Sequence, residues 1–136
     1  MLSLSLPGRV FVCTLPTDMR KSFDSLAGLV RTALDQDPLS GDLFVFCSRR
    51  SDRLKLLYWD NDGLAIWYKR LEKGSFILPR ADGKRGRVGE HGLVLRPAEL
   101  AMLLDGVDLA SVKRQKRYQR PTPPLLPASA ALPSNG

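Results

Sequence analysis

The chain has 136 residues, 43% of them hydrophobic, and a formal net charge of +7. This length fits one domain with a real core, and no apolar run approaches the roughly 20 residues that a membrane-spanning helix needs. The N-terminus has neither the basic stretch nor the small-residue cleavage site of a secretory signal. We therefore expect a cytoplasmic protein with no membrane partner.

The positive charge is concentrated towards the C-terminus. Residues 1–112 hold 16 Lys and Arg against 14 Asp and Glu, whereas residues 113–136 hold 5 Lys and Arg and no acid. We expect a single domain over 1–112, followed by a basic and then Pro-rich disordered tail. A basic tail attracts polyanions, of which nucleic acid is the commonest in the cytosol. The alternative is that the tail only keeps the protein soluble.

Residue types that carry catalysis or bind metal are sparse. Cys13 and Cys47 fall in predicted strands, which favours buried thiols over a disulfide. The single histidine, His91, lies in a glycine-rich stretch and cannot build a usual zinc site. No Walker-type loop or acidic triad for Mg²⁺ is apparent in the sequence. We therefore expect no catalytic residues, no metal, no cofactor and no small-molecule substrate.

The N-terminal half begins with a strand and a helix. Residues 9–14 are apolar and predict a strand that Pro16 ends. Thr17 or Asp18 can then cap a long helix that runs to about Leu34, because its apolar residues recur at helical spacing.

Two cations fall in the first turn of that predicted helix. Arg20 and Lys21 lie where a helix has free N–H groups, so together they make a plausible phosphate-binding site. The alternative is that both are solvent-exposed, or that Arg20 pairs with an acid such as Asp24.

A three-stranded antiparallel meander follows, and the rest of the chain is organised around it. The predicted strands are separated by a polar loop over 49–52 and a three-residue turn over 61–63, with glycine at its last position. The strands themselves cover residues 41–48, 53–60 and 64–71.

The three-residue turn sets the register of the second hairpin and therefore the composition of each face. It places Lys55 opposite Lys69, and by the same register Trp59 opposite Ala65 and Leu57 opposite Trp67. One face then combines both tryptophans with both lysines, as a nucleic-acid surface requires. The alternative is that the tryptophans pack under a helix while the lysines extend into solvent.

The C-terminal half predicts shorter elements. We expect a strand over 75–79, a mobile basic loop over 80–92, a short strand over 93–95, a helix from Pro97 and a docked segment over 107–112. Together the elements predict an α+β fold: an antiparallel sheet of four to five strands, a long N-terminal helix on one face and a short C-terminal helix at the end or flank.

Three segments resemble a known family. They are the motif PTDMRK at 16–21, the run from 37 to 55, and residues 59–74, which include WYKRLEKG. These motifs are specific, and over residues 9–110 the chain resembles the TnpB accessory protein (Orf2-like) family of insertion sequence sixty-six. The resemblance implies a bacterial mobile-element protein, encoded beside a separate DDE-type transposase and needed for efficient transposition. No catalytic residue is assigned in that family, so none is carried over.

We therefore predict a non-catalytic accessory protein for DNA transposition that binds transposon-end DNA through basic surfaces and assists the transposase. The alternative is a protein-interaction adaptor that contacts the transposase through an apolar patch at the two tryptophans and has little DNA affinity. The candidate DNA contacts are basic and aromatic side chains: Arg20, Lys21, Arg49, Arg50, Arg53, Lys55, Trp59, Trp67, Lys69, Lys84, Arg85, Arg87, Lys113, Arg114, Lys116 and Arg117.

Overall fold

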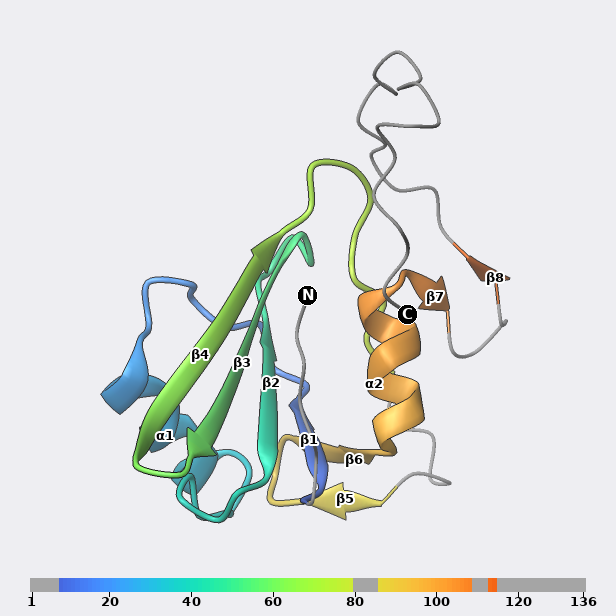
Figure 1. The fold of residues 1–136 in the computed structure, drawn as a ribbon. Helices are drawn as coiled ribbons and strands as arrows, with labels where there is room; N and C mark the ends of the chain where they lie inside the picture. The colour runs from blue at the N-terminus through green and yellow to red at the C-terminus, as the bar shows by residue number, and fades with distance from the viewer. Residues whose placement is uncertain (1–7, 80–85, 109–112, 115–136) are drawn as a thin grey trace, which may run out of the picture.

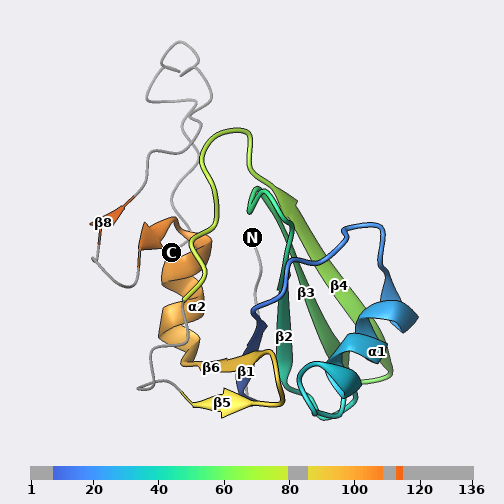
Figure 2. The ribbon, with the colours of Figure 1, turned by 180° about the vertical axis from the view of Figure 1, so that it is seen from behind.

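Two helices lie on opposite faces of a six-stranded mixed sheet (Figures 1 and 2). The computed structural model describes residues 8–79, 86–108 and 113–114. The elements, in chain order, are β1 (Val10–Cys13), α1 (Phe23–Thr32), β2 (Leu43–Cys47), β3 (Arg53–Asp60), β4 (Gly63–Arg70), β5 (Arg87–Val88), β6 (Gly92–Leu95), α2 (Pro97–Leu104), β7 (Val107–Asp108) and β8 (Lys113–Arg114).

The strand order of the main sheet is β4-β3-β2-β1-β6-β5, and β7 and β8 form a separate pair. The sheet is mixed because β1 runs parallel to β2 and antiparallel to β6. A parallel neighbour needs a crossover, and the segment containing α1 provides it. The predicted meander is present as β2-β3-β4, but the expectation of a purely antiparallel sheet of four to five strands is wrong.

The core is double-layered because both faces of the sheet are covered. Val10 and Val12 face the α2 side, whereas Phe11 and Cys13 face the α1 side, and all four side chains are fully buried. Strands buried on both faces are apolar throughout instead of alternating with polar residues. The C-terminal helix therefore covers a face of the sheet, and the prediction that it sits at the end or flank is wrong.

The N-terminal helix is short. The N-terminal element is strand β1, as predicted, but α1 begins at Phe23 instead of near Asp18 and has 10 residues. The backbone N–H of Thr17 donates to the carbonyl oxygen of Cys47 at 2.8 Å, and the Asp18 carboxylate accepts the N–H of Arg20 at 2.9 Å. These bonds hold residues 17–20 in a loop, since a short acidic side chain can bond nearby backbone in place of helical hydrogen bonds.

The register of the β3-β4 hairpin differs by one residue from the predicted one. Lys55 pairs with Tyr68 and Leu56 pairs with Trp67, which leaves a two-residue turn at 61–62. Asn61 takes the left-handed conformation there, with φ of 60°, and Gly63 begins β4. A shift of one residue exchanges the faces of one strand relative to the other, so the expected face with both tryptophans and both lysines does not exist.

The C-terminal elements differ in part from expectation. Residues 75–79 form no strand; Phe76 instead buries its ring in the core on the α2 side. The loop predicted over 80–92 contains β5, and the hairpin that β5 forms with β6 packs on the end of α1, where the N–H of His91 donates to the carbonyl oxygen of Ala33 at 3.1 Å. The short strand near 93–95 and the helix from Pro97 are confirmed as β6 and α2.

The two cysteines are buried and free, as predicted. Cys13 faces the α1 side and Cys47 the α2 side, so their thiols lie on opposite faces of the sheet. Burial raises the pKa of both thiols, that of Cys47 to about 11. Among the described residues, no helix has the length and apolar character to cross a membrane.

Gly92 marks a close approach that a methyl group would disrupt. A Cβ at this position would collide with the carbonyl oxygen of Val88 and lie 2.8 Å from a methyl of Leu34. We expect Gly92→Ala to lower the free energy of unfolding by about 1–3 kcal/mol through overpacking. Gly28→Ala is the control, because a Cβ there meets nothing within 4 Å and alanine favours a helix by about 0.5–1 kcal/mol. Urea unfolding measures both; equal stability of the two variants would contradict the close approach.

Candidate functional site

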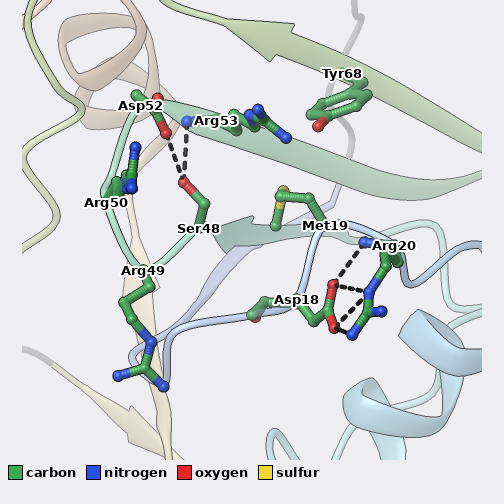
Figure 3. Close-up of a pocket in the computed structure, with 10 residues that line it drawn as sticks. Asp18, Met19, Arg20, Ser48, Arg49, Arg50, Asp52, Arg53 and Tyr68 are labelled. Atoms are coloured by element: carbon green, nitrogen blue, oxygen red, sulfur yellow. Dashed lines mark hydrogen bonds and ion pairs between the residues drawn. The ribbon is translucent and has the colours of Figure 1, made fainter.

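An open pocket of about 450 Å³ lies where the ends of β1 and β2 meet (Figure 3). Because β1 and β2 are parallel neighbours, the segments that follow them emerge at the same edge of the sheet. Residues 17–20 follow β1 and residues 48–53 follow β2. Together with one side chain of β4 they line the pocket: Thr17, Asp18, Met19, Arg20, Ser48, Arg49, Arg50, Asp52, Arg53 and Tyr68.

The turn from β2 to β3 presents arginine side chains to solvent. Ser48 Oγ donates to Asp52 at 3.2 Å and accepts the N–H of Arg53 at 3.1 Å, which fixes both ends of the turn. Arg49 and Arg50 lie at its tip and are exposed. Arg53 follows at the start of β3. Neither it nor Arg49 nor Arg50 forms an ion pair with a residue in the described part of the chain.

Lys55 anchors the loop that carries Met19 and Arg20, two of the pocket residues. Its Nζ donates to the carbonyl oxygens of Met19 at 2.8 Å and Lys21 at 2.7 Å, and lies 4.7 Å from the ring centroid of Tyr68. Its exposed fraction is only 7%. Lys55, predicted as a DNA contact, therefore has its ammonium group occupied by the backbone of the loop and acts as a positioning residue.

Arg20 lines the pocket with a carboxylate beside it. Its guanidinium donates to both oxygens of Asp18, from Nε at 3.0 and 3.1 Å and from Nη2 at 2.7 Å. These hydrogen bonds, with the backbone N–H of Arg20, lower the pKa of the Asp18 carboxyl to about 2. The predicted alternative partner, Asp24, is not used.

The electrostatic balance of the pocket favours anions. Four arginines line it against two aspartates, and one of those aspartates is bound to Arg20. Guanidinium groups match phosphate oxygens in a bidentate geometry. Within the described residues, no cluster of three His, Cys, Asp or Glu side chains could hold a metal ion.

The other predicted contacts are dispersed. Trp67 and Lys69 belong to β4, and the register puts them on the α2 side, away from the pocket. Trp59 shares the α1 side with Lys55 but lies near the opposite end of β3. Arg87 is in β5, at the opposite edge of the sheet from β4.

Some predicted contacts cannot be assigned a place in the pocket. Lys21 contributes its carbonyl oxygen to Lys55 but does not line the pocket. Lys113 and Arg114 form β8, of which only the backbone is described. Four of the predicted contacts lie outside the described residues: Lys84, Arg85, Lys116 and Arg117.

Tyr68 is a pocket residue that sequence reasoning missed. In the predicted register it falls on the aliphatic core side, whereas in the structure it lies opposite Lys55 and is 48% exposed. A two-residue turn at 61–62, in place of the predicted three-residue turn, would have placed Tyr68 opposite Lys55.

Comparison with known proteins identifies the family. The sequence profile of the IS66 Orf2-like proteins matches residues 8–114. The chain belongs to this family. It is therefore a transposition-associated accessory protein, associated with the IS66 transposable element.

Two relatives of this chain occur in Sinorhizobium fredii. Uncharacterized protein y4jC is 41% identical over 114 residues, covering 84% of this chain and 91% of the relative. Uncharacterized protein y4hO is 40% identical over 100 residues, covering 74% of this chain and 81% of the relative. No solved structure matches the chain significantly.

The contacts of Lys55 predict a stability difference between two lysines that the sequence had grouped together. Lys55→Met keeps the aliphatic stem but leaves the carbonyl oxygens of Met19 and Lys21 without their donor, so we expect a loss of about 1–3 kcal/mol. Lys69→Met removes an exposed charge on the other side of the sheet and should change stability by less than about 0.5 kcal/mol. Urea unfolding of both variants tests this, and equal losses would refute the role of Lys55.

The pairing of Asp18 with Arg20 predicts a pH dependence at acid pH. Because the folded-state pKa lies below the ordinary value of 3.8, at about 2, the ionised carboxylate favours the folded protein. This contribution is complete above about pH 4 and is lost as the pH falls towards 2. NMR titration of the Asp18 carboxyl carbon should give a midpoint near 2 that moves back up in Arg20→Gln; an unmoved midpoint would rule out Arg20 as its cause.

Proposed function

We propose that this protein is a non-catalytic accessory factor that binds transposon-end DNA through the arginine pocket and assists a separate DDE transposase. The observation that carries the proposal is that four arginines from two separate segments line one open pocket. Three of them, Arg49, Arg50 and Arg53, have no carboxylate partner among the described residues. Four guanidinium groups against two carboxylates leave the pocket with an excess of positive charge, which favours a polyanion.

The chemistry of the pocket favours contact with the sugar–phosphate backbone. Arginine side chains bind phosphate oxygens and release condensed counterions, which makes the affinity fall steeply with salt. Such contacts position a protein on DNA without reading its sequence. An accessory role fits this mode, because the recognition of particular ends is left to a partner.

The remaining predictions complete this proposal. Residues 1–112 act as the single DNA-binding domain in the cytoplasm, and the basic segment at 113–120 adds non-specific attraction. The predicted DNA-contacting face with Trp59 and Trp67 is not part of the proposal, since these side chains lie on opposite sides of the sheet.

The same observation weakens the adaptor alternative. That hypothesis used the two tryptophans as one apolar contact for the transposase, and the sheet separates them. It is therefore kept as an outcome of the binding experiment below.

Charge removal at the pocket should weaken DNA binding more than equal charge removal elsewhere. We expect Arg49→Gln with Arg50→Gln to lower the affinity for a transposon-end duplex by about tenfold or more, since even one lost charged hydrogen bond is worth about 1.5–3 kcal/mol and about 1.4 kcal/mol is tenfold. The slope of log affinity against log salt should fall by about 2. Electrophoretic mobility shifts at several salt concentrations measure both quantities.

The matched control is Arg31→Gln with Lys69→Gln, which also removes two exposed positive charges but none from the pocket. Its affinity should stay within about threefold of the parent, because neither side chain lines the pocket and exposed charges are screened by salt. Equal losses in the two double variants would mean that overall charge, and not the pocket, binds DNA. If the parent protein binds no DNA but retains the transposase in a pull-down, the adaptor hypothesis is correct.

A further inference from the structure

We propose that the pocket binds an unpaired nucleotide, with a phosphate on the arginines and the base stacked on Tyr68, so that the preferred ligand is single-stranded nucleic acid. This inference rests on the proposed function, since it specifies the form of nucleic acid that the arginine pocket accepts. It starts from the one aromatic side chain among the pocket residues.

The ring of Tyr68 is held in place but not covered. Tyr68 belongs to β4 and pairs with Lys55 of β3, whose Nζ lies 4.7 Å from the ring centroid. Two backbone carbonyls hold that ammonium group at 2.7 and 2.8 Å, so the cation is fixed against one face of the ring. The side chain is nevertheless 48% exposed. The contact with Lys55 therefore leaves about half of the residue open to solvent.

An exposed tyrosine with one supported face is a stacking platform. Bases stack on aromatic side chains whatever their identity, because every base has a π face. A platform that is already positioned loses little conformational freedom on binding. The anchored ammonium of Lys55 thus prepares the ring for a base, although it does not touch the ligand itself.

The arginines lie where the phosphate of the same nucleotide can reach them. Arg53 and Tyr68 project from neighbouring strands to the same side of the sheet, two positions apart along the hairpin. Figure 3 shows Arg53 between Asp52 and Tyr68, with Arg49 and Arg50 on the adjoining turn. The volume of about 450 Å³ falls within the range of about 300–1,000 Å³ typical of small-ligand pockets.

The position of the ring selects single strands over duplex. The bases of a duplex are stacked on one another and cannot lie flat on a side chain inside a protein pocket unless they are flipped out. An unpaired nucleotide offers its base without that cost. Backbone contacts alone, by contrast, would not distinguish strongly between the two forms.

The test compares three 12-nucleotide probes by fluorescence anisotropy: a single strand, the same strand with abasic sites at its central positions, and the corresponding duplex. Inorganic tripolyphosphate serves as a competitor. We expect the parent protein to bind the single strand more tightly than the duplex. The abasic strand should bind about fivefold to a hundredfold more weakly, the range for stacking of one base. Tripolyphosphate should compete with all of them for the arginines.

Two variants distinguish the contribution of the aromatic ring of Tyr68 to affinity from the contributions of its hydroxyl group and its size. Tyr68→Leu should lower the affinity for the single strand by the same factor as the abasic sites, and should bind the abasic strand as the parent does. Tyr68→Phe keeps the ring and should bind as the parent. Thermal melting of each variant checks that it is folded, and the abasic comparison on the parent protein needs no variant at all.

Each outcome bears on a different claim. If the abasic strand binds the parent as tightly as the normal strand, or Tyr68→Leu changes nothing, base stacking is refuted while backbone binding stands. If duplex and single strand bind equally and both depend on Arg49 and Arg50, the proposed function stands alone. If no probe binds, the proposed function and this inference both fail.

Discussion

A buried ammonium group without a carboxylate partner among the described residues is the interaction on which the site depends. Removing a charged group from water is costly unless other polar groups replace its hydration. Two carbonyl oxygens and the ring of Tyr68 do this for Lys55. The consequence is geometric: a residue of β3 fixes the backbone of a loop more than 30 positions earlier in the chain. That loop carries Arg20 and Asp18, so the anchored lysine determines where one wall of the pocket stands.

The second constraint is the position of β1 in the middle of the sheet. Because β1 and β2 are parallel, the chain leaves both at the same edge, and the bond from Thr17 to Cys47 prolongs their contact beyond the last paired residues. The two segments that emerge are the PTDMRK motif at 16–21 and the basic turn at 48–53. An antiparallel arrangement would have sent them to opposite ends of the sheet, and no pocket would have formed.

These two constraints explain why the family motifs occur where they do. Segments 16–21 and 48–53 meet, and WYKRLEKG adds Tyr68 to them. The pocket that results is lined by four arginine and two aspartate side chains. The excess of cationic side chains in its lining is the feature on which the proposed binding of an anionic polymer rests.

Local sequence patterns determined the meander β2-β3-β4, strand β6, helix α2, the buried cysteines and the family. They could not determine the register of the β3-β4 hairpin, because both faces of a sheet are apolar when helices cover both sides. A register shifted by one residue therefore fits the hydrophobic pattern equally well. Asn61, not Gly63, supplies the positive φ of the turn, and either residue type is suitable in isolation.

The sequence by itself determined which residues are basic, the approximate positions of strands β1 to β4 and β6, and the family of the chain, because composition, short motifs and short-range periodicity encode these properties. Only the tertiary structure decided that Arg20 lines the same pocket as Arg49, Arg50 and Arg53. It also decided that Lys55 anchors the loop that carries Arg20, and that Tyr68 lines the pocket. The physical reason is that these contacts arise from a parallel strand pairing and a hairpin register, and both are set by packing between segments far apart in the chain.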